Sequence, residues 1–523
     1  MKQVLVIALT LCAALPAHAA APQPNPVVKT ADGSVSGAID ATSRVASFKG
    51  LPFAAPPVGE LRWRAPQPER PWKGVRDGSS FGPSCMQPVH GDFLPWTEEF
   101  LVHGKVSEDC LYLNVWTPRA KKGANLPVVV FIPGGGFVEG SGSVPIYNGT
   151  KLAATGLVVV TVNYRLGVFG FLAYPGLTAE SPHHASGNYG LLDQIAALAW
   201  VRRNIGAFGG NSRNVTVWGQ SAGAISVGAL LVSPRARGLF QRAMADSGLG
   251  FEGFPTPDLQ AAEQTGERFA AAHHADSLKE LRAIPAADLL PGRDGHFRFT
   301  PDIDRWVLTA SPHALNQTGS GSDVPVITGY QANDGLLFTP PIRSKKDFED
   351  WVSRTYGTMT GEFERLYPGG SLQQMQLSVT ESNRDRDRVS MFLWAKARLQ
   401  TRKSPVYTYF FTQAIPWPQH PEFGAFHSGE LPYFFRNLDL MARPWQPMDH
   451  HVSDTTSAYL KAFATTGDPN ARGLPHWPAV EAASPQTMEI GRKMRPMPLA
   501  SKARYQFWLK YFESDEAKNA PFF

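Results

Sequence analysis

The stretch of residues 214–231 constrains the fold of this chain more than any other. Residues 215–218 (Val-Thr-Val-Trp) have the apolar character of a short buried strand, and residues 222–231 are the small and apolar residues of a buried helix. Between them, residues 219–223 (Gly-Gln-Ser-Ala-Gly) match the pattern G-x-S-x-G. Glycine on both sides lets the chain turn sharply. The Ser221 hydroxyl is then exposed above the end of a sheet, facing the N–H groups that begin the helix.

The pattern is short enough to occur by chance, and the chain contains a second copy of it. Residues 78–82 (Gly-Ser-Ser-Phe-Gly) also fit, but Arg76 and Asp77 precede them and Pro83 follows. We expect no strand to enter this copy and no helix to leave it, so it is predicted to be a loop. Only Ser221 has the strand–turn–helix context that makes a serine a candidate nucleophile.

Composition favours one large globular unit. The chain has 523 residues, of which 43% are hydrophobic and 31 are phenylalanine, enough for a large core. No low-complexity linker and no internal repeat divides it, so residues 20–523 are expected to form a single domain. The formal net charge of +5 is small for this length and is not clustered. It gives no reason to expect binding to nucleic acid or to an anionic membrane.

Residues 1–19 have the order of a secretory signal peptide. Lys2 supplies the positive charge, residues 4–15 form an apolar run too short to span a membrane, and residues 17–19 (Ala-His-Ala) form an A-x-A cleavage site. A buried N-terminal helix is the alternative. We expect the signal peptide to be cleaved and the mature protein to be exported, either to a periplasm or to the medium.

Cysteine usage agrees with export. Cys12 would carry a lipid in a lipoprotein, but Leu11 stands where a lipoprotein needs a small residue. Cleavage leaves Cys85 and Cys110, and two cysteines in an oxidising compartment are most simply paired in a disulfide. Two reduced, buried cysteines are the alternative. The disulfide would stabilise the fold by about 3 kcal/mol through loop closure.

Apolar runs and helical spacing alternate along the chain. Residues 27–38 alternate as an antiparallel hairpin, whereas residues 48–63 contain too many prolines for regular structure. Strands are predicted at 127–132, 157–163, 324–328 and 405–411. Helices are predicted at 191–208, 389–399 and 457–464. Strands that alternate with helices predict an α/β fold, with a largely parallel sheet covered by helices on both faces.

At these motifs the chain resembles the type-B carboxylesterases, the cholinesterase-like and para-nitrobenzyl-esterase-like family of α/β-hydrolases. Residues 208–223 fit the long serine signature of that family, and residues 108–118 (Glu-Asp-Cys-Leu-Tyr-Leu-Asn-Val-Trp-Thr-Pro) fit its second signature. Further landmarks lie at 48–63, 134–137 and 463–470. The resemblance spans nearly all of the mature chain. It implies an α/β-hydrolase fold with a large, mostly parallel sheet and helical cap insertions, which we place near 250–320 and 340–400.

The resemblance also implies a catalytic triad. Ser221 matches the nucleophile, Asp334 the acid and His427 the histidine, in the chain order serine, acid, histidine that α/β-hydrolases share. In such a triad the histidine takes the serine proton during attack, and the carboxylate fixes its tautomer. Asp302 and Asp304 compete for the role of acid, and Asp304 looks like a structural aspartate of the family.

The same resemblance assigns three backbone donors and a disulfide. Gly135, Gly136 and Ala222 match the oxyanion hole, whose N–H groups stabilise the charge of a tetrahedral intermediate. Cys85 and Cys110 match a family disulfide. The neighbouring His450 and His451 are better explained by a loop or a cap before a helix than by catalysis.

The chain departs from the family pattern at two site positions. Gln220 stands where many members have glutamate, and Asp334 stands where the acid is usually glutamate. A choline-type site is not expected, because Trp96 does not fall at the spacing of the family's cation-binding tryptophan, which Phe100 occupies instead.

The sequence therefore predicts an exported serine esterase that hydrolyses carboxylic esters through an acyl-enzyme. An amidase or peptidase on the same triad, and a binding protein without catalytic activity, are the alternatives. The expected partner is a small-molecule ester. No H-E-x-x-H motif or cysteine cluster points to a metal, and no cofactor is implied. Neither the physiological ester nor the oligomeric state follows from the sequence.

Overall fold

The computed structural model describes residues 25–290, 297–337 and 339–519. An 11-stranded sheet forms its centre. Its seven inner strands, β15, β14, β13, β12, β11, β9 and β10, run parallel, and the strands at the two edges pair antiparallel. This confirms the predicted α/β fold. Across the sheet the order is β16 (Met494–Pro498), β15 (Gln486–Ile490), β14 (Val406–Phe411), β13 (Val326–Gln331), β12 (Arg242–Asp246), β11 (Gly210–Gln220), β9 (Leu126–Ile132), β10 (Val158–Val162), β8 (Tyr112–Thr117), β4 (Ala46–Pro52) and β3 (Ala38–Ile39).

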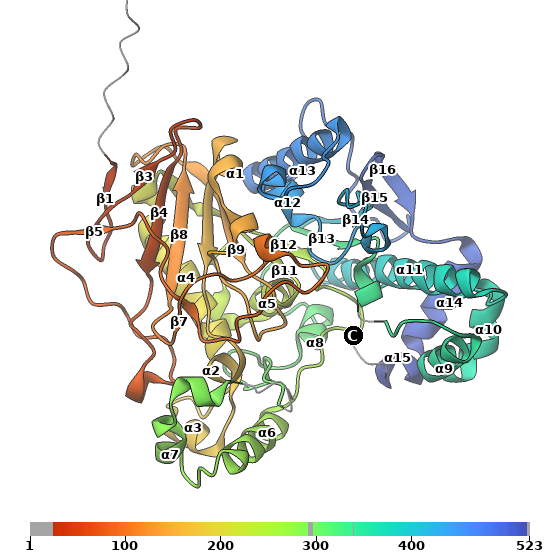
Figure 1. Cartoon of the computed structure of the whole chain (residues 1–523), viewed down its shortest axis with the longest axis horizontal. Coiled ribbons are helices and arrows are strands. Elements are labelled where there is room, and N and C mark those ends of the chain that lie inside the picture. Colours follow the sequence, from red (N-terminus) through yellow and green to blue (C-terminus); the bar gives the residue numbers. More distant parts are fainter. Residues whose placement is uncertain (1–24, 291–296, 338, 520–523) are drawn as a thin grey trace, which may run out of the picture.

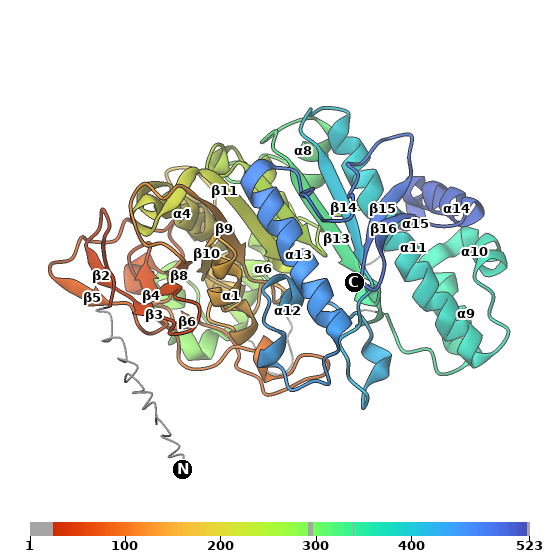
Figure 2. The same cartoon turned by 90° about the horizontal axis from the view of Figure 1, so that it is seen from above.

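Helices cover both faces of the sheet, as Figure 2 shows. Side chains of β9 alternate between two cores, one on each face of the sheet. Val128 and Val130 belong to one core, and Val129 and Phe131 belong to the other. A strand buried in this way needs apolar residues at every position, which is why its sequence is a continuous apolar run. The core of Val128 and Val130 is covered by α4 (Tyr189–Asn204), α5 (Ala222–Val232) and α11 (Leu372–Leu399). The core of Val129 and Phe131 is covered by α1 (Thr150–Ala154), α12 (Leu431–Phe434) and α13 (Pro447–Thr466).

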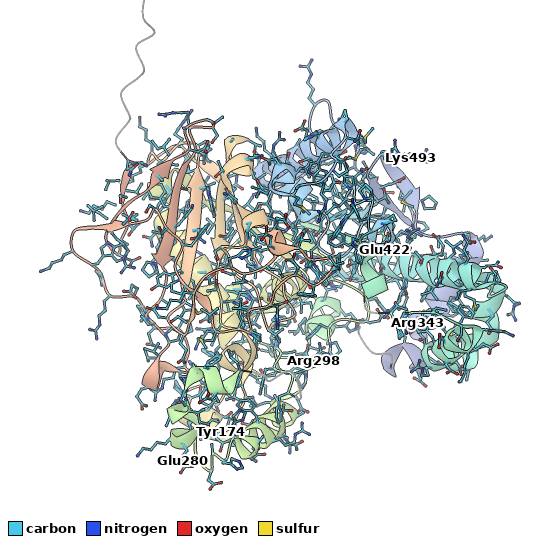
Figure 3. The ribbon with its side chains drawn as sticks, viewed as in Figure 1. Tyr174, Glu280, Arg298, Arg343, Glu422 and Lys493 are labelled. Atoms are coloured by element: carbon cyan, nitrogen blue, oxygen red, sulfur yellow. A yellow bond between two sulfur atoms is a disulfide. The ribbon has the colours of Figure 1, made fainter. Side chains whose placement is uncertain are left out.

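Two groups of helices stand beyond the sheet (Figure 1). The insertion at 250–320 supplies α6 (Leu259–Ala272), α7 (Leu278–Ala283) and α8 (Pro312–Gln317), and α6 and α7 lie near α3 (Pro175–Glu180). The insertion at 340–400 supplies α9 (Lys345–Tyr356) and α10 (Thr360–Leu366) beyond the sheet, next to α11, and the C-terminal α14 (Lys502–Glu513) and α15 (Asp515–Asn519) join them. Figure 3 labels Tyr174 just before α3, Glu280 in α7 and Arg343 just before α9.

The N-terminal part of the described chain holds a small sheet and the disulfide. β1 (Val27–Lys29) and β2 (Ser34–Ser36) form the predicted hairpin, and β5 (Val75–Asp77) pairs with β2. Cys85 and Cys110 are joined in a disulfide, as predicted. Cys85 is the last residue of β6 (Ser84–Cys85), and Cys110 comes shortly after β7 (Val106–Ser107). The short α2 (Gly167–Phe171) follows β10. The predicted signal peptide lies outside the described residues.

Three local expectations were wrong. Residues 46–52 form β4 despite the nearby prolines, because all but Pro52 come after the strand and a bulge between Phe48 and Leu51 keeps it paired with β8. A strand, β5, does enter the second G-x-S-x-G copy, although no helix leaves it. α13 begins at Pro447 rather than near residue 457, so His450 and His451 lie inside its first turns.

No helix among residues 25–290, 297–337 and 339–519 is long and apolar enough to cross a membrane.

Candidate active site

Ser221 lies at the tip of the sharp turn between β11 and α5. Its backbone angles, φ 56° and ψ −125°, are those of a strained conformation that residues with a side chain rarely adopt. The Ser221 N–H donates to the carbonyl of Asp246 at 2.8 Å, which ties the turn to the end of β12. The strain is therefore held by the surrounding sheet, and it lifts the hydroxyl above the carboxyl ends of the parallel strands.

The glycines on both sides of Ser221 are required by close backbone contacts. A Cβ atom at Gly219 would lie 2.2 Å from the carbonyl oxygen of Gly223, and one at Gly223 would lie 2.1 Å from that of Ile132. Neither space admits a side chain, so the turn depends on both glycines. The structure thus gives a steric reason for the G-x-S-x-G pattern.

Asp334 and His427 come from separate loops that are paired by their backbones. Asp334 follows β13 and begins a 3-10 helical turn, and His427 precedes α12. Asn333 forms a parallel bridge with Phe426, and the Asn333 N–H donates to the carbonyl of Ala425 at 2.9 Å. This bridge places Asp334 Oδ1 against His427 Nδ1 in a short hydrogen bond, and both side chains are buried. Nδ1 therefore carries the proton of a neutral imidazole, and Nε2 is the basic nitrogen.

Nε2 of His427 faces the turn that carries Ser221. The side-chain amide of Gln220, the residue before Ser221, lies 3.2 Å from this nitrogen. An acid, an imidazole and the serine turn are thus aligned in the order that lets the imidazole remove a proton from a hydroxyl. Figure 3 labels Glu422, which lies in the loop that leads to His427.

The predicted backbone donors belong to segments that adjoin Ser221. Gly134 packs so closely on the turn that a Cβ there would lie 2.9 Å from the Cβ of Ser221. Gly135 and Gly136 follow with φ of 109° and 62°. Among the described residues, neither of their N–H groups donates a hydrogen bond. Ala222 is the first residue of α5, where N–H groups have no partner within the helix. The three N–H groups of the predicted oxyanion hole are thus without an acceptor among the described residues.

Comparison with known proteins identifies the family to which this arrangement belongs. The model of the carboxylesterase family matches residues 24–508. The chain belongs to the carboxylesterase family. It is thus a carboxylic ester hydrolase of that family, and the predicted family and enzyme class are both confirmed.

Characterised carboxylesterases resemble the chain along most of its length. Fumonisin B1 esterase of Sphingopyxis macrogoltabida is 36% identical over 90% of this chain and 87% of its own length. Para-nitrobenzyl esterase of Bacillus subtilis is 36% identical over 88% of this chain and 94% of its own length. Human cocaine esterase is 33% identical over 93% of this chain and 91% of its own length.

The competing aspartates of this carboxylesterase have structural surroundings. Asp304 Oδ1 accepts hydrogen bonds from the N–H groups of Trp306, Val307 and Leu308 at 3.0, 2.8 and 3.0 Å. The Asp302 carboxylate lies close to Gly187, where a Cβ would come within 2.7 Å of it. Asp304 therefore organises the loop before α8, and of the three candidate aspartates it is Asp334 that contacts His427.

The structure brings Trp96 close to the site, which the sequence spacing does not predict. Its ring stands edge-on to the His427 imidazole with 6.4 Å between centroids, whereas Phe100 packs on Phe426 at 5.8 Å. The loop closed by Cys85 and Cys110 carries Trp96 there. Trp96 is thus an aromatic residue of this loop whose ring contacts the His427 imidazole, and Phe100 packs on Phe426, the residue before His427 in the chain.

Two further carboxyl groups, those of Asp246 and Glu430, are buried near the turn, and no sequence motif marks them. Burial, opposed by a 2.6 Å hydrogen bond from Trp218 Nε1, raises the pKa of Asp246 to about 7. Burial and the nearby Asp246 raise the pKa of Glu430 well above its ordinary value. Since both ionised forms are disfavoured, these groups add little negative charge beside His427 below neutral pH.

A cavity of about 360 Å³ opens beside Asp334 and His427. It lies between the end of β13 and the helices α9, α11 and α14, and its walls include both aromatic and charged side chains. Its volume is in the range of small-molecule sites. The cavity is therefore bordered by two of the three predicted triad side chains, Asp334 and His427.

Proposed function

We propose that this carboxylesterase acts through an acyl-enzyme on Ser221, with His427 as general base and acid and Asp334 as its carboxylate partner. The observation that carries the proposal is the alignment of Asp334, His427 and the strained turn of Ser221. Each of these side chains comes from a different loop at the carboxyl ends of the strands. A histidine held by a carboxylate on Nδ1 presents Nε2 as a base, which is what a serine nucleophile requires.

The proposed reaction has two halves. Ser221 Oγ attacks the ester carbonyl carbon while His427 Nε2 takes its proton, and the carbonyl oxygen becomes an oxyanion next to the N–H groups of Gly135, Gly136 and Ala222. The C–O bond to the alcohol then breaks, and His427 gives the proton to the departing alkoxide oxygen. Water attacks the acyl-enzyme in the same way and releases the acid and free Ser221. Each oxyanion donor contributes about 3 kcal/mol in enzymes of this kind.

Labelling the nucleophile tests this mechanism directly. A fluorophosphonate probe followed by peptide mass analysis should modify Ser221, and Ser221→Ala should remove both labelling and turnover. Ser80→Ala is the matched control, because Ser80 belongs to the second G-x-S-x-G copy but is exposed and followed by no helix. Equal losses in the two variants, or labelling at another serine, would refute the assignment.

The natural ester is best approached with a panel of esters. The relatives are named for a para-nitrobenzyl ester, for fumonisin B1 and for cocaine. We infer that the helices of the 250–320 and 340–400 insertions form caps over the site and select among such substrates. Matched amides of the best ester distinguish an esterase from an amidase, and the esterase proposal requires faster cleavage of the ester.

We also propose that the mature protein is exported after removal of residues 1–19. The support is the order of charge, apolar run and small residues at the N-terminus, together with the Cys85–Cys110 disulfide, which persists in oxidising compartments. The intact mass of the protein recovered outside the cytoplasm should correspond to a chain that begins at Ala20. An unprocessed N-terminus or a lipid on Cys12 would contradict export as a free protein.

A further inference from the structure

The cavity beside the triad has charged groups whose partners can be traced one by one. The Asp334 carboxylate accepts a hydrogen bond from Nδ1–H of His427. Arg386 on α11 donates to Glu252 Oε1 through Nη2 at 2.9 Å and Nε at 3.2 Å. These two pairs account for two carboxylates and one guanidinium of the cavity wall. Both N–H groups of Arg386 donate to the same oxygen of Glu252, and the second oxygen has only a 3.4 Å contact with the Ser390 hydroxyl.

Asp387, the next residue of α11, lines the same cavity with no such partner. Its carboxylate forms no ion pair and no hydrogen bond with any residue that the structure describes, and it is half-buried. Burial and the nearby Asp334 raise the pKa of Asp387 well above its ordinary value, although the charges of Arg386 and Arg388 oppose this shift. A carboxylate in such a place is stabilised by a cation that enters the cavity, because a positive charge within about 4–6 Å favours the ionised form.

The remaining walls suit the apolar part of a cation. Trp351 and Tyr356 of α9 stand edge to face with 5.6 Å between ring centroids, and Tyr511 of α14 lies 5.4 Å from Tyr356. The Tyr511 hydroxyl is buried and has no hydrogen-bond partner among the described residues, although it belongs to the cavity wall. Aromatic faces beside carboxylates are the usual surroundings of bound ammonium groups.

An anionic group fits this cavity less well. Arg386 is already paired with Glu252. The other arginine of the wall, Arg354, has no acidic partner within the described chain, but its side chain is exposed to solvent. Asp387, Asp334 and Glu252 would repel a carboxylate placed between them. The balance of charges facing the cavity therefore favours a positively charged ligand.

We propose that this cavity is a subsite for a protonated amine, with Asp387 as its counter-ion, and that the enzyme prefers carboxylic esters that carry an ammonium group. The proposal rests on the proposed function, since the ammonium group is recognised while the ester carbonyl is held at Ser221. Asp387 is a specificity-determining residue in this account and takes no part in proton transfer.

Three benzoate esters of similar size test the proposal: dimethylaminopropyl, isohexyl and carboxypropyl benzoate, which are cationic, neutral and anionic at neutral pH. We expect kcat/KM for the cationic ester to exceed that for the neutral ester by about tenfold, the effect of one well-placed charge. Asp387→Asn should reduce this ratio to about one, and Asp387→Lys should invert it in favour of the anionic ester. Ratios within one variant cancel any common effect on the triad.

Asp350→Asn is the matched control, because Asp350 is exposed on α9 and pairs with Lys346 away from the cavity. It should keep the wild-type ratio. Competitive inhibition of isohexyl benzoate cleavage by benzyldimethylamine, compared with benzyl alcohol, measures the subsite without turnover of a charged ester. Should Asp387→Asn fail to fold, this comparison in the wild-type enzyme decides the question.

Failure of the subsite is distinguishable from failure of the proposed function. Equal cleavage of all three esters, or a preference for the anionic ester, would overturn the amine subsite and leave the esterase intact. Absence of cleavage of every ester together with an unlabelled Ser221 would overturn the esterase itself.

Discussion

The amide nitrogen of Gln220 lies 3.2 Å from Nε2 of His427, the nitrogen that receives the Ser221 proton in the proposed mechanism. Because Asp334 binds Nδ1–H, a neutral imidazole accepts at Nε2, and Gln220 can donate to it there. Once the ring is an imidazolium, Nε2 carries a proton and can no longer accept a hydrogen bond from the amide N–H of Gln220. Gln220 is therefore a side chain in contact with the nitrogen that acts as the base.

Gln220→Glu should move the acid limb of the kcat/KM pH profile to higher pH by about one unit. The carboxylate would lie against Nε2 and favour the protonated ring, so that less free base is present at a given pH. Profiles measured between pH 5 and 9 with a neutral ester check this, and the rate of fluorophosphonate labelling should follow the same limb. An unchanged profile would mean that residue 220 does not influence the base.

Asp334→Asn should lower turnover by about three to four orders of magnitude, because an amide favours the wrong imidazole tautomer while it preserves the shape of the side chain. Substrate binding and folding should change far less. Stopped assays at saturating ester, with circular dichroism as a check of folding, measure both.

Asp304→Asn is the comparison for that variant. Asp304 gathers three backbone N–H groups, so its replacement should lower stability more than turnover per folded molecule. Near-normal turnover in Asp334→Asn and its loss in a folded Asp304→Asn would show that the wrong acid had been chosen.

Replacing Cys85 and Cys110 by serine together should lower the free energy of unfolding by about 3 kcal/mol, from the loss of a closed loop. It should also raise KM, because the loop between them holds Trp96 against His427. Denaturant unfolding and ester kinetics measure the two effects separately. Unaltered kinetics in the double variant would show that Trp96 is positioned by its other contacts.

The residues that could be predicted from sequence are those whose local pattern leaves one structural solution. Gly219 and Gly223 admit no Cβ, and the apolar run of β9 is buried on both faces, so short patterns sufficed. β12, Arg-Ala-Met-Ala-Asp, escaped prediction because it has no β-branched or aromatic residue and becomes a strand only through its neighbours β11 and β13.

Other features depended on contacts between distant residues. Asp387 is one of several charges in a helix and would ordinarily be solvated, and only the packing of α9 and α14 turns it into a cavity wall. The start of α13 is marked by local features of the sequence: Pro447 occupies the first turn, and Asp449 completes a capping box with Gln446. These features place His450 and His451 inside the helix.

The buried carboxyl of Asp246 should make stability depend on pH in an identifiable direction. Its pKa is about 7 in the folded chain, against an ordinary value of 3.8, so the native state holds a proton that the unfolded chain releases between these values. The contribution to stability is thus complete below about pH 4 and is lost as the pH rises through 7. Asp246→Asn removes this dependence while it can still accept the Trp218 hydrogen bond.

We therefore expect Asp246→Asn to gain stability relative to the wild type as the pH is raised from 4.5 to 8, by about 4 kcal/mol at most. Guanidinium unfolding of both proteins at the two pH values measures the change, and subtraction removes the titration of all other groups. Asp276→Asn is the control, because Asp276 is exposed and should show a difference that does not vary with pH. A pH-independent difference for Asp246→Asn as well would mean that this carboxyl remains ionised behind the serine turn, where its charge would act on His427.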